Sequence, residues 1–465
     1  MKRGKTMSTN NNDLQRGLKN RHIQMIALGG AIGTGLFYGS AQTIQLVGPG
    51  ITLSYLIGGI VIFLIMRMLG EMSVDEPVSG SFSHYAYKYW GEFPGFLSGW
   101  NYWFNYVIVS MAELTAVGIY INYWWPDIPH WISALVFLVV ITLINLVNVK
   151  LYGEFEFWFA IVKVAAIIGM IILGALMIFT GVGGPATGFS NLWMHGGFMP
   201  NGTWGLLLSL VIVMFSFGGI ELIGITAGEA DNPKKSIPQA INQVMWRILI
   251  FYIGALTVMM IIYPWNQVGV DGSPFVQIFS KMGIPAAATI LNIVVLTAAL
   301  SVYNSGIYSN ARMLYSLAQQ GNAPKCFTKL SKNGIPVAGV LVSSSLTLVV
   351  VILNYLMPGK VFMYLISIAV GAAVISWVMI AITNLKFRKS KGEAAAQLTF
   401  KTPWHPYTNY FCLAFLIMII VLMTQIDGMK MAIYILPAWI LVLWGAFKIK
   451  KSATEKEEIV IEPIK

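Results

Sequence analysis

The chain has 465 residues, of which 57% are hydrophobic and 11% are charged, and its mean hydropathy is +0.70. A soluble domain fills its core with far less apolar sequence, so this composition excludes a soluble globular protein and indicates an integral membrane protein. The net charge of +11 does not require a nucleic-acid partner, because basic residues also gather in the cytoplasmic loops of membrane proteins.

Apolar stretches long enough to cross a hydrocarbon core of about 30 Å recur from end to end, so we expect an all-α integral membrane protein with twelve transmembrane helices. Their expected ranges are 23–43, 51–69, 97–122, 131–149, 156–180, 204–227, 244–263, 286–306, 338–356, 361–384, 408–426 and 429–447. The first range follows a basic polar arm, 1–22, and does not resemble a cleavable signal, so it is interpreted as the first helix.

The basic residues predict the orientation of these helices, because Lys and Arg near helix ends stay in the cytoplasm. With both termini inside, the arm, the inner loops and the tail 448–465 hold 26 of the 30 Lys and Arg residues. The outer loops then hold only Lys281, Lys360 and Lys430. We therefore expect both termini to be cytoplasmic.

The two cysteines, Cys326 and Cys412, predict neither a disulfide framework nor a metal site. None of the five histidines falls near the centre of a predicted helix. The sequence also shows no nucleophile–base pair and no nucleotide loop, so neither an enzyme nor a bound cofactor is expected.

The first predicted helix contains the stretch HIQMIALGGAIGTGLF, with four glycines near its middle. Each glycine disfavours a helix by about 1 kcal/mol relative to alanine, and lipid offers no partner for a backbone group that a break releases. Close helix packing would explain Gly29 and Gly33, which have small-xxx-small spacing. A break at 33–35, filled by protein or ligand, is the other interpretation.

The sixth predicted helix also has adjacent glycines near its centre, Gly218 and Gly219, in the stretch FSFGGIE. Interrupted helices at matching places in two halves, here helices 1–5 and 6–10, are typical of inverted-repeat secondary transporters with a site at the membrane midplane. The pairing therefore favours a break over simple packing in both helices.

Two such breaks would offer complementary chemistry. A helix that begins after a break presents unpaired N–H groups and the positive end of its dipole, which at Gly33, Thr34 and Gly35 suits a carboxylate. The break in helix 6 would leave carbonyl oxygens near 215–218 that suit an ammonium group. Side by side, the two breaks predict a site for an α-amino acid.

Three ionisable residues lie well within predicted helices: Glu113, Lys163 and Glu221. Such residues are costly in lipid and are candidates for function, although a structural ion pair or a polar tie between helices would also explain each of them.

Aromatic residues accompany these groups. Tyr106 and Glu113 share one face of the third helix, so Tyr106 is a candidate to contact a substrate side chain, although interfacial aromatics would have the same composition. Phe215 and Phe217 flank the second break and are candidates to close over a ligand.

Several long motifs occur in a familiar order: LKNRHIQMIALGGAIGTGLFYGS, LGEMSVDEPVSGSF, FSFGGIELIGITAGEADNPKKSIPQA and ALSVYNSGIYSNARMLYSLAQQGNAPK. With them, the chain resembles the bacterial amino acid transporter family of the amino acid, polyamine and organocation superfamily. Within that family GSFSHYAYKYWGEFPGF, GWNYW and MAELTAVG are most similar to the aromatic amino acid permeases.

The resemblance implies a leucine-transporter-type fold, with a five-plus-five inverted repeat, discontinuous helices 1 and 6, and two extra helices. It implies that the substrate carboxylate binds at Gly33, Thr34 and Gly35 and that the amino group binds near 215–219. It also implies proton coupling through Lys163, with Glu113 and Glu221 as further candidates.

The expected function is import of aromatic amino acids by proton symport across the bacterial inner membrane. A permease or exchanger for another amino acid class, a sodium symporter and a non-transporting amino acid sensor remain alternatives. No obligate protein partner is evident beyond substrate, protons and lipid. The expected organisation is an arm (1–22), a first repeat (23–180), a second repeat (204–386), two added helices (408–447) and a tail (448–465).

Overall fold

The computed structural model describes residues 32–461, except 79, 148, 182–183, 185–186, 226–231 and 271, and these residues form helices and connecting segments without a β-strand. The α-helices are α2 (Ser40–Val47), α3 (Ile51–Asp75), α4 (Ser81–Tyr89), α5 (Glu92–Ile121), α6 (His130–Val147), α7 (Val149–Thr180), α8 (Gly202–Phe215), α9 (Leu222–Ile225), α10 (Pro233–Arg247), α11 (Ala255–Ile262), α12 (Pro274–Lys281), α13 (Pro285–Gln319), α14 (Val337–Thr347), α15 (Val349–Leu356), α16 (Val361–Lys391), α17 (Tyr407–Met423) and α18 (Met431–Ile461). Two π-helical segments, Gly35–Gly39 and Ile248–Gly254, and several short 3₁₀ turns complete the helical structure.

Within the described part of the chain, nine helical runs are long and apolar enough to cross a membrane, and two shorter apolar helices, α8 and α17, accompany them. These helices fall on the ranges expected from the sequence, apart from 23–43, which lies partly outside the described residues together with Gly29 and Gly30. The chain is therefore an all-helical, multi-pass protein.

The longest of these runs, Gly35–Asp75, contains a turn between α2 and α3. Gly48 has a φ of 59°, a left-handed value that glycine tolerates best, and Pro49 follows it at the start of the 3₁₀ turn Gly48–Gly50. Both α2 and α3 pack against α8, so the turn places two successive helices on one neighbour.

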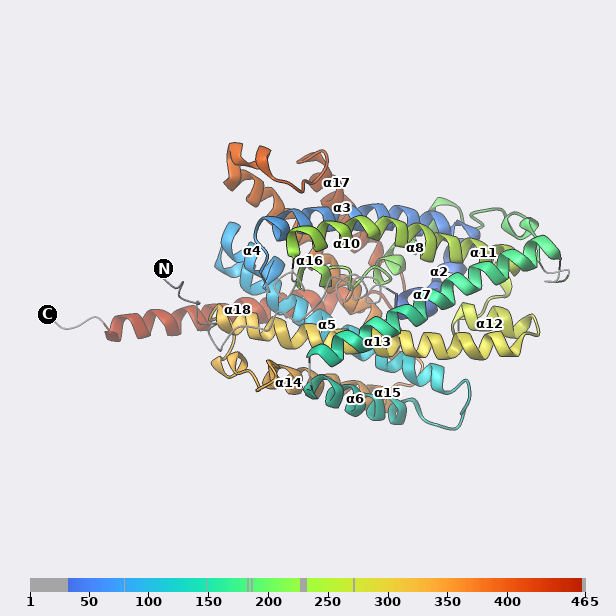
Figure 1. The fold of residues 1–465 in the computed structure, drawn as a ribbon, viewed down its shortest axis with the longest axis horizontal. Coiled ribbons are helices and arrows are strands. Elements are labelled where there is room, and N and C mark those ends of the chain that lie inside the picture. Colours follow the sequence, from blue (N-terminus) through green and yellow to red (C-terminus); the bar gives the residue numbers. More distant parts are fainter. Residues whose placement is uncertain are drawn as a thin grey trace, which may run out of the picture.

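Helices α5, α13 and α16 form the centre of the bundle. In the most apolar 18-residue stretches of α5 and α16, 83% of the stretch is buried inside the protein. The corresponding share for α18 is 17%. Helix α5 packs along both α13 and α16. Figure 1 shows these helices running lengthwise through the molecule, with α3 and α10 on one side and α6 and α14 on the other.

The two ends of the bundle carry segments that the sequence predicts on different sides of the membrane. Helix α4 and the last turns of α18 lie at one end in Figure 1, and α12 lies at the opposite end. The sequence predicts the first two of these segments on the cytoplasmic side and the loop that contains Lys281 on the outer side. The arrangement thus places segments of opposite predicted location at opposite ends.

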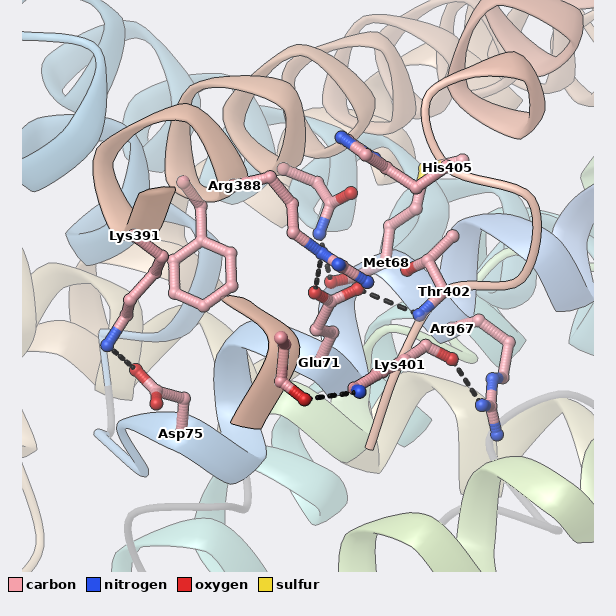
Figure 2. Close-up of polar contacts among 12 residues, drawn as sticks. Arg67, Met68, Glu71, Asp75, Arg388, Lys391, Lys401, Thr402 and His405 are labelled. Carbon is pink, nitrogen blue, oxygen red and sulfur yellow. Dashed lines mark hydrogen bonds and ion pairs between the residues drawn. The ribbon is translucent and has the colours of Figure 1, made fainter. Parts of the chain in front are cut away.

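A polar cluster joins α3, α16 and the segment between α16 and α17 (Figure 2). The Glu71 carboxylate has no exposed side-chain surface, forms an ion pair with Arg388, and accepts a hydrogen bond from the Thr402 backbone N–H at 2.8 Å. One turn further along each helix, Lys391 pairs with Asp75 at 2.7 Å in a more exposed position. The cluster therefore connects the segment between α16 and α17 to both α3 and α16.

We expect Arg388→Ala to lower the free energy of unfolding by about 3 kcal/mol, because it leaves the buried Glu71 carboxylate without its ion-pair partner. Lys391→Ala is the matched control and should cost less than about 1 kcal/mol, because its pair with Asp75 is partly solvated. Thermal unfolding of the purified proteins in detergent measures both effects. Equal losses of thermal stability in the two variants would contradict this interpretation.

Candidate functional site

The helix predicted at 204–227 is interrupted. Helix α8 ends at Phe215, residues 216–221 form turns, and α9 begins at Leu222. Gly219 has a φ of 96°, which a residue with a side chain rarely adopts, so a glycine is required at this point of the chain. The interruption lies inside the protein, since Ser216 and Glu221 are both buried.

The chain at the predicted break of helix 1 lies against this interruption. After a bend at Ile32 and Gly33, helical structure begins at Thr34 and continues as a π-helical segment from Gly35. A Cβ atom on Gly35 would lie 2.6 Å from the Cα atom of Ser216. The two backbones therefore approach each other as closely as they do only because residue 35 has no side chain.

Both segments line a small buried cavity of about 30 Å³, well below the range of about 300–1,000 Å³ that is typical of small-molecule sites. Seven predicted site residues line it: Gly33, Gly35, Tyr106, Glu113, Phe215, Gly218 and Gly219. The sequence analysis did not single out the other lining residues: Asn105, Val109, Met214, Ser216, Val302, Ala369, Val370 and Ala373.

The spacing on α5 could have indicated two of the missed residues. Asn105, Val109 and Glu113 follow one another at intervals of four and therefore share one face of the helix. The contributions of α13 and α16, in contrast, have no local sequence signal, because small apolar residues are common throughout both helices. Only the packing of these helices on α5 brings Val302 and Ala369 to the cavity.

Two of the predicted substrate-binding residues, Thr34 and Phe217, do not line the cavity. The Thr34 hydroxyl donates a hydrogen bond to Oε1 of Glu113 at 2.8 Å, so Thr34 holds the carboxylate of a lining residue. Phe217 is fully buried behind the break, where its ring packs against Tyr55 and Tyr252 with centroid distances of 5.8 and 5.3 Å. Phe215 alone of the two phenylalanines faces the cavity.

The carbonyl groups at the helix 6 break are partly occupied within the protein. The Phe215 carbonyl accepts a hydrogen bond from the Gly218 N–H at 3.1 Å, and the Ser216 carbonyl accepts one from the Tyr252 hydroxyl at 3.0 Å. The expected release of all carbonyls from 215 to 218 therefore holds only in part. Each of these two oxygens retains one further lone pair for a ligand.

The three predicted ionisable residues occupy different places. Glu113 lines the cavity, while Glu221 lies at the end of the break, where its Oε1 atom accepts a hydrogen bond from the Gly219 N–H at 3.3 Å. Lys163 on α7 does not line the cavity. It is fully buried behind the helix 1 segment and donates hydrogen bonds to the Ile32 carbonyl at 3.2 Å and to Ser301 at 2.8 Å.

A fourth ionisable residue, Glu156, completes this network. The Ser301 hydroxyl donates to Oε1 of Glu156 at 2.5 Å, and the Glu156 side chain is fully buried. Sequence analysis missed this residue because it falls at the predicted start of a helix, although it precedes Lys163 by two helical turns and so shares its face. The network links α7, α13 and the start of helix 1.

A second, larger cavity of about 710 Å³ opens toward the end of the bundle that carries α12. Tyr38 and Phe362 both line it, and their rings pack edge to face at a centroid distance of 4.6 Å.

Among the described residues, no group of three His, Cys, Asp or Glu side chains is placed to hold a metal ion. The central cavity offers backbone, carboxylate and aromatic groups to a ligand.

The chain matches the amino acid permease family over residues 22–460. It belongs to this family. Since the family is part of the amino acid, polyamine and organocation superfamily, the resemblance inferred from the motifs is confirmed.

Individual relatives of this permease cover nearly its whole length. The aromatic amino acid transport protein AroP of Escherichia coli O6:H1 is 57% identical over 442 residues, which are 95% of this permease and 97% of that protein. AroP of Salmonella typhimurium strain LT2 is 55% identical over the same shares of the two chains. The amino acid permease YtnA of Bacillus subtilis, which has no characterised function, is 53% identical over 95% of this permease and 96% of its own chain.

Proposed function

We propose that this permease imports aromatic amino acids by proton symport. The observation that supports the proposal most directly is the close approach of Gly35 to the interruption of helix 6 at Ser216, beside a buried cavity lined by Tyr106 and Phe215. Relatives that are 55–57% identical over 95% of the chain are named aromatic amino acid transport proteins, which supports the choice of substrate.

In the proposed complex, the N–H groups at Gly33, Thr34 and Gly35 bind the substrate carboxylate, because they begin a helix and attract negative charge. The amino group lies against the helix 6 break at 215–219, where the carbonyl oxygens retain lone pairs. The aromatic ring occupies the part of the cavity beside Tyr106. Phe217 supports the break from behind rather than contacting the substrate.

Protonation of the buried ionisable groups couples to transport in this proposal. Lys163 contacts the Ile32 carbonyl, so a change in its charge acts on the segment that begins the carboxylate site. Glu113 contacts Thr34 and faces the cavity, while Glu221 lies at the opposite break. A proton drives uphill transport only if protonation changes the relative stability of the outward-facing and inward-facing states.

The proposed architecture has twelve transmembrane helices with both termini in the cytoplasm of a bacterium and the protein in the inner membrane. Residues 23–180 and 204–386 form the two inverted repeats, and 408–447 form the added helices. The segments 1–22 and 448–465 are then the cytoplasmic arm and tail. Alternating access follows from movement of the interrupted helices relative to the rest of the bundle.

Uptake by proteoliposomes tests the proposed substrate and coupling. With an imposed proton gradient, labelled phenylalanine should accumulate over time, and excess tyrosine or tryptophan should compete while leucine, lysine, proline and γ-aminobutyrate should not. Failure of all three aromatic amino acids would contradict the substrate assignment. A requirement for sodium would contradict proton coupling, exchange without net uptake would indicate an exchanger, and binding without uptake would indicate a sensor.

A further inference from the structure

Asn105 is a polar residue of the central cavity that the proposed mechanism does not use. It lies on α5, it is one of the residues that line the cavity, and it is 2% exposed. Its carboxamide oxygen is buried and has no hydrogen-bond partner in the described part of the chain. A buried polar atom without a partner is unfavourable, so a ligand atom is a natural partner for it.

Other asparagines within the bundle use the amide nitrogen of this side chain in hydrogen bonds, and the carboxamide oxygens of Asn101 and Asn354 are also buried without a partner among the described residues. Asn145 and Asn354 each donate to the backbone carbonyl four residues earlier, at 3.0 Å. Asn101, one turn before Asn105 on the same helix, donates to the Ala372 carbonyl at 2.8 Å and to Ser376 at 3.0 Å. The Asn101 bonds connect α5 to α16, whereas Asn105 is a lining residue of the cavity.

The position of Asn105 along α5 separates it from the site for the substrate backbone. Glu113 lies next to the helix 1 break, since a Cβ atom on Gly33 would be 3.3 Å from its Oε1 atom. Asn105 is two turns away on the same face, about 12 Å along the helix axis. A substrate whose carboxylate is bound at 33–35 therefore directs its side chain, rather than its backbone groups, toward Asn105.

Small apolar residues of α16 also line the cavity. Ala369 and Ala373 of α16 line the cavity, and Asn101 anchors α5 to α16 through the carbonyl of the adjacent Ala372. These two alanines are one helical turn apart and therefore share one face of α16. Polar recognition by Asn105 is thus combined with an apolar surface for the ring.

We propose that Asn105 is a specificity-determining residue that hydrogen-bonds the polar atom of an aromatic substrate side chain, either the tyrosine hydroxyl or the tryptophan indole N–H. This inference rests on the proposed transport of aromatic amino acids. The hydroxyl of tyrosine can both donate and accept, and the indole N–H donates to the carboxamide oxygen. Phenylalanine leaves that oxygen unpaired, and a site with an unpaired polar group discriminates against such a ligand.

Competition against labelled phenylalanine in proteoliposomes tests the inference. The probes are tyrosine, tryptophan and 4-methylphenylalanine, which has about the size of tyrosine but cannot hydrogen-bond through its ring substituent. The wild-type protein should bind tyrosine about tenfold more tightly than 4-methylphenylalanine. In Asn105→Leu this preference should be lost, and Asn105→Ala should behave in the same way if the leucine variant does not fold.

Val109→Leu is the matched control, since it alters the volume of the same wall without changing its hydrogen-bonding groups. It should change competition by tyrosine and 4-methylphenylalanine to the same extent. An equal affinity of the wild-type protein for these two probes, or an unchanged preference in the Asn105 variants, overturns the role of Asn105 and leaves aromatic transport standing. Failure of the wild-type protein to accumulate any aromatic amino acid instead overturns the proposed function.

Discussion

Lys163→Gln is expected to reduce the accumulation of substrate against its concentration gradient to the level of passive equilibration, a loss of about 100-fold or more in a strongly energised membrane. Lys163 is fully buried and donates hydrogen bonds to Ile32 and Ser301. Glutamine retains a donor of similar length but cannot carry a proton, so hydrogen bonding can persist while coupling is lost. Proteoliposomes with an imposed proton gradient measure the accumulation ratio.

Counterflow without a gradient provides the necessary control for folding, because exchange of substrate across the membrane needs an intact site but no net proton movement. Lys430→Gln is the matched substitution at an exposed lysine, whose pair with Asp427 at 2.8 Å lies at the surface. It should leave accumulation unchanged. Proton-dependent accumulation of wild-type magnitude in Lys163→Gln would exclude Lys163 as the coupling group.

Gly35→Ala is expected to lower the rate of uptake by about 100-fold or more. The added Cβ would lie 2.6 Å from Cα and 2.9 Å from N of Ser216, so the helix 1 and helix 6 segments must separate. Backbone atoms cannot rotate away as a flexible side chain can, and overpacking of this kind typically costs about 1–3 kcal/mol. Separation also displaces the N–H groups proposed to bind the carboxylate.

Gly39→Ala provides the comparison within the same π-helical segment. A Cβ atom at that position has no neighbour closer than 3.8 Å, so the substitution should retain most of the uptake. Initial rates in proteoliposomes and the melting temperature of each purified variant separate loss of function from loss of folding. Similar uptake rates in the two variants would mean that the close approach at Gly35 is not needed for transport.

The sequence predicted the interrupted helix 6 because its signal is local: adjacent glycines in an apolar segment disfavour a continuous helix. In the structure, helix α8 indeed ends at Phe215. The sequence did not distinguish the role of Phe215 from that of Phe217, since both lie just before the two glycines. Their different orientations depend on the turn at 216–221, which places Phe217 against Tyr55 and Tyr252.

By itself, the sequence determined that this is a helical membrane protein of the amino acid permease family, because hydrophobic segment length and long motifs are properties of contiguous residues. Only the tertiary structure decided which side chains share the cavity. Asn105 on α5, Val302 on α13 and Ala369 on α16 meet there through helix packing. The pairing of Lys163 with Ser301 likewise depends on contacts between distant segments, and no local pattern of residues specifies such contacts.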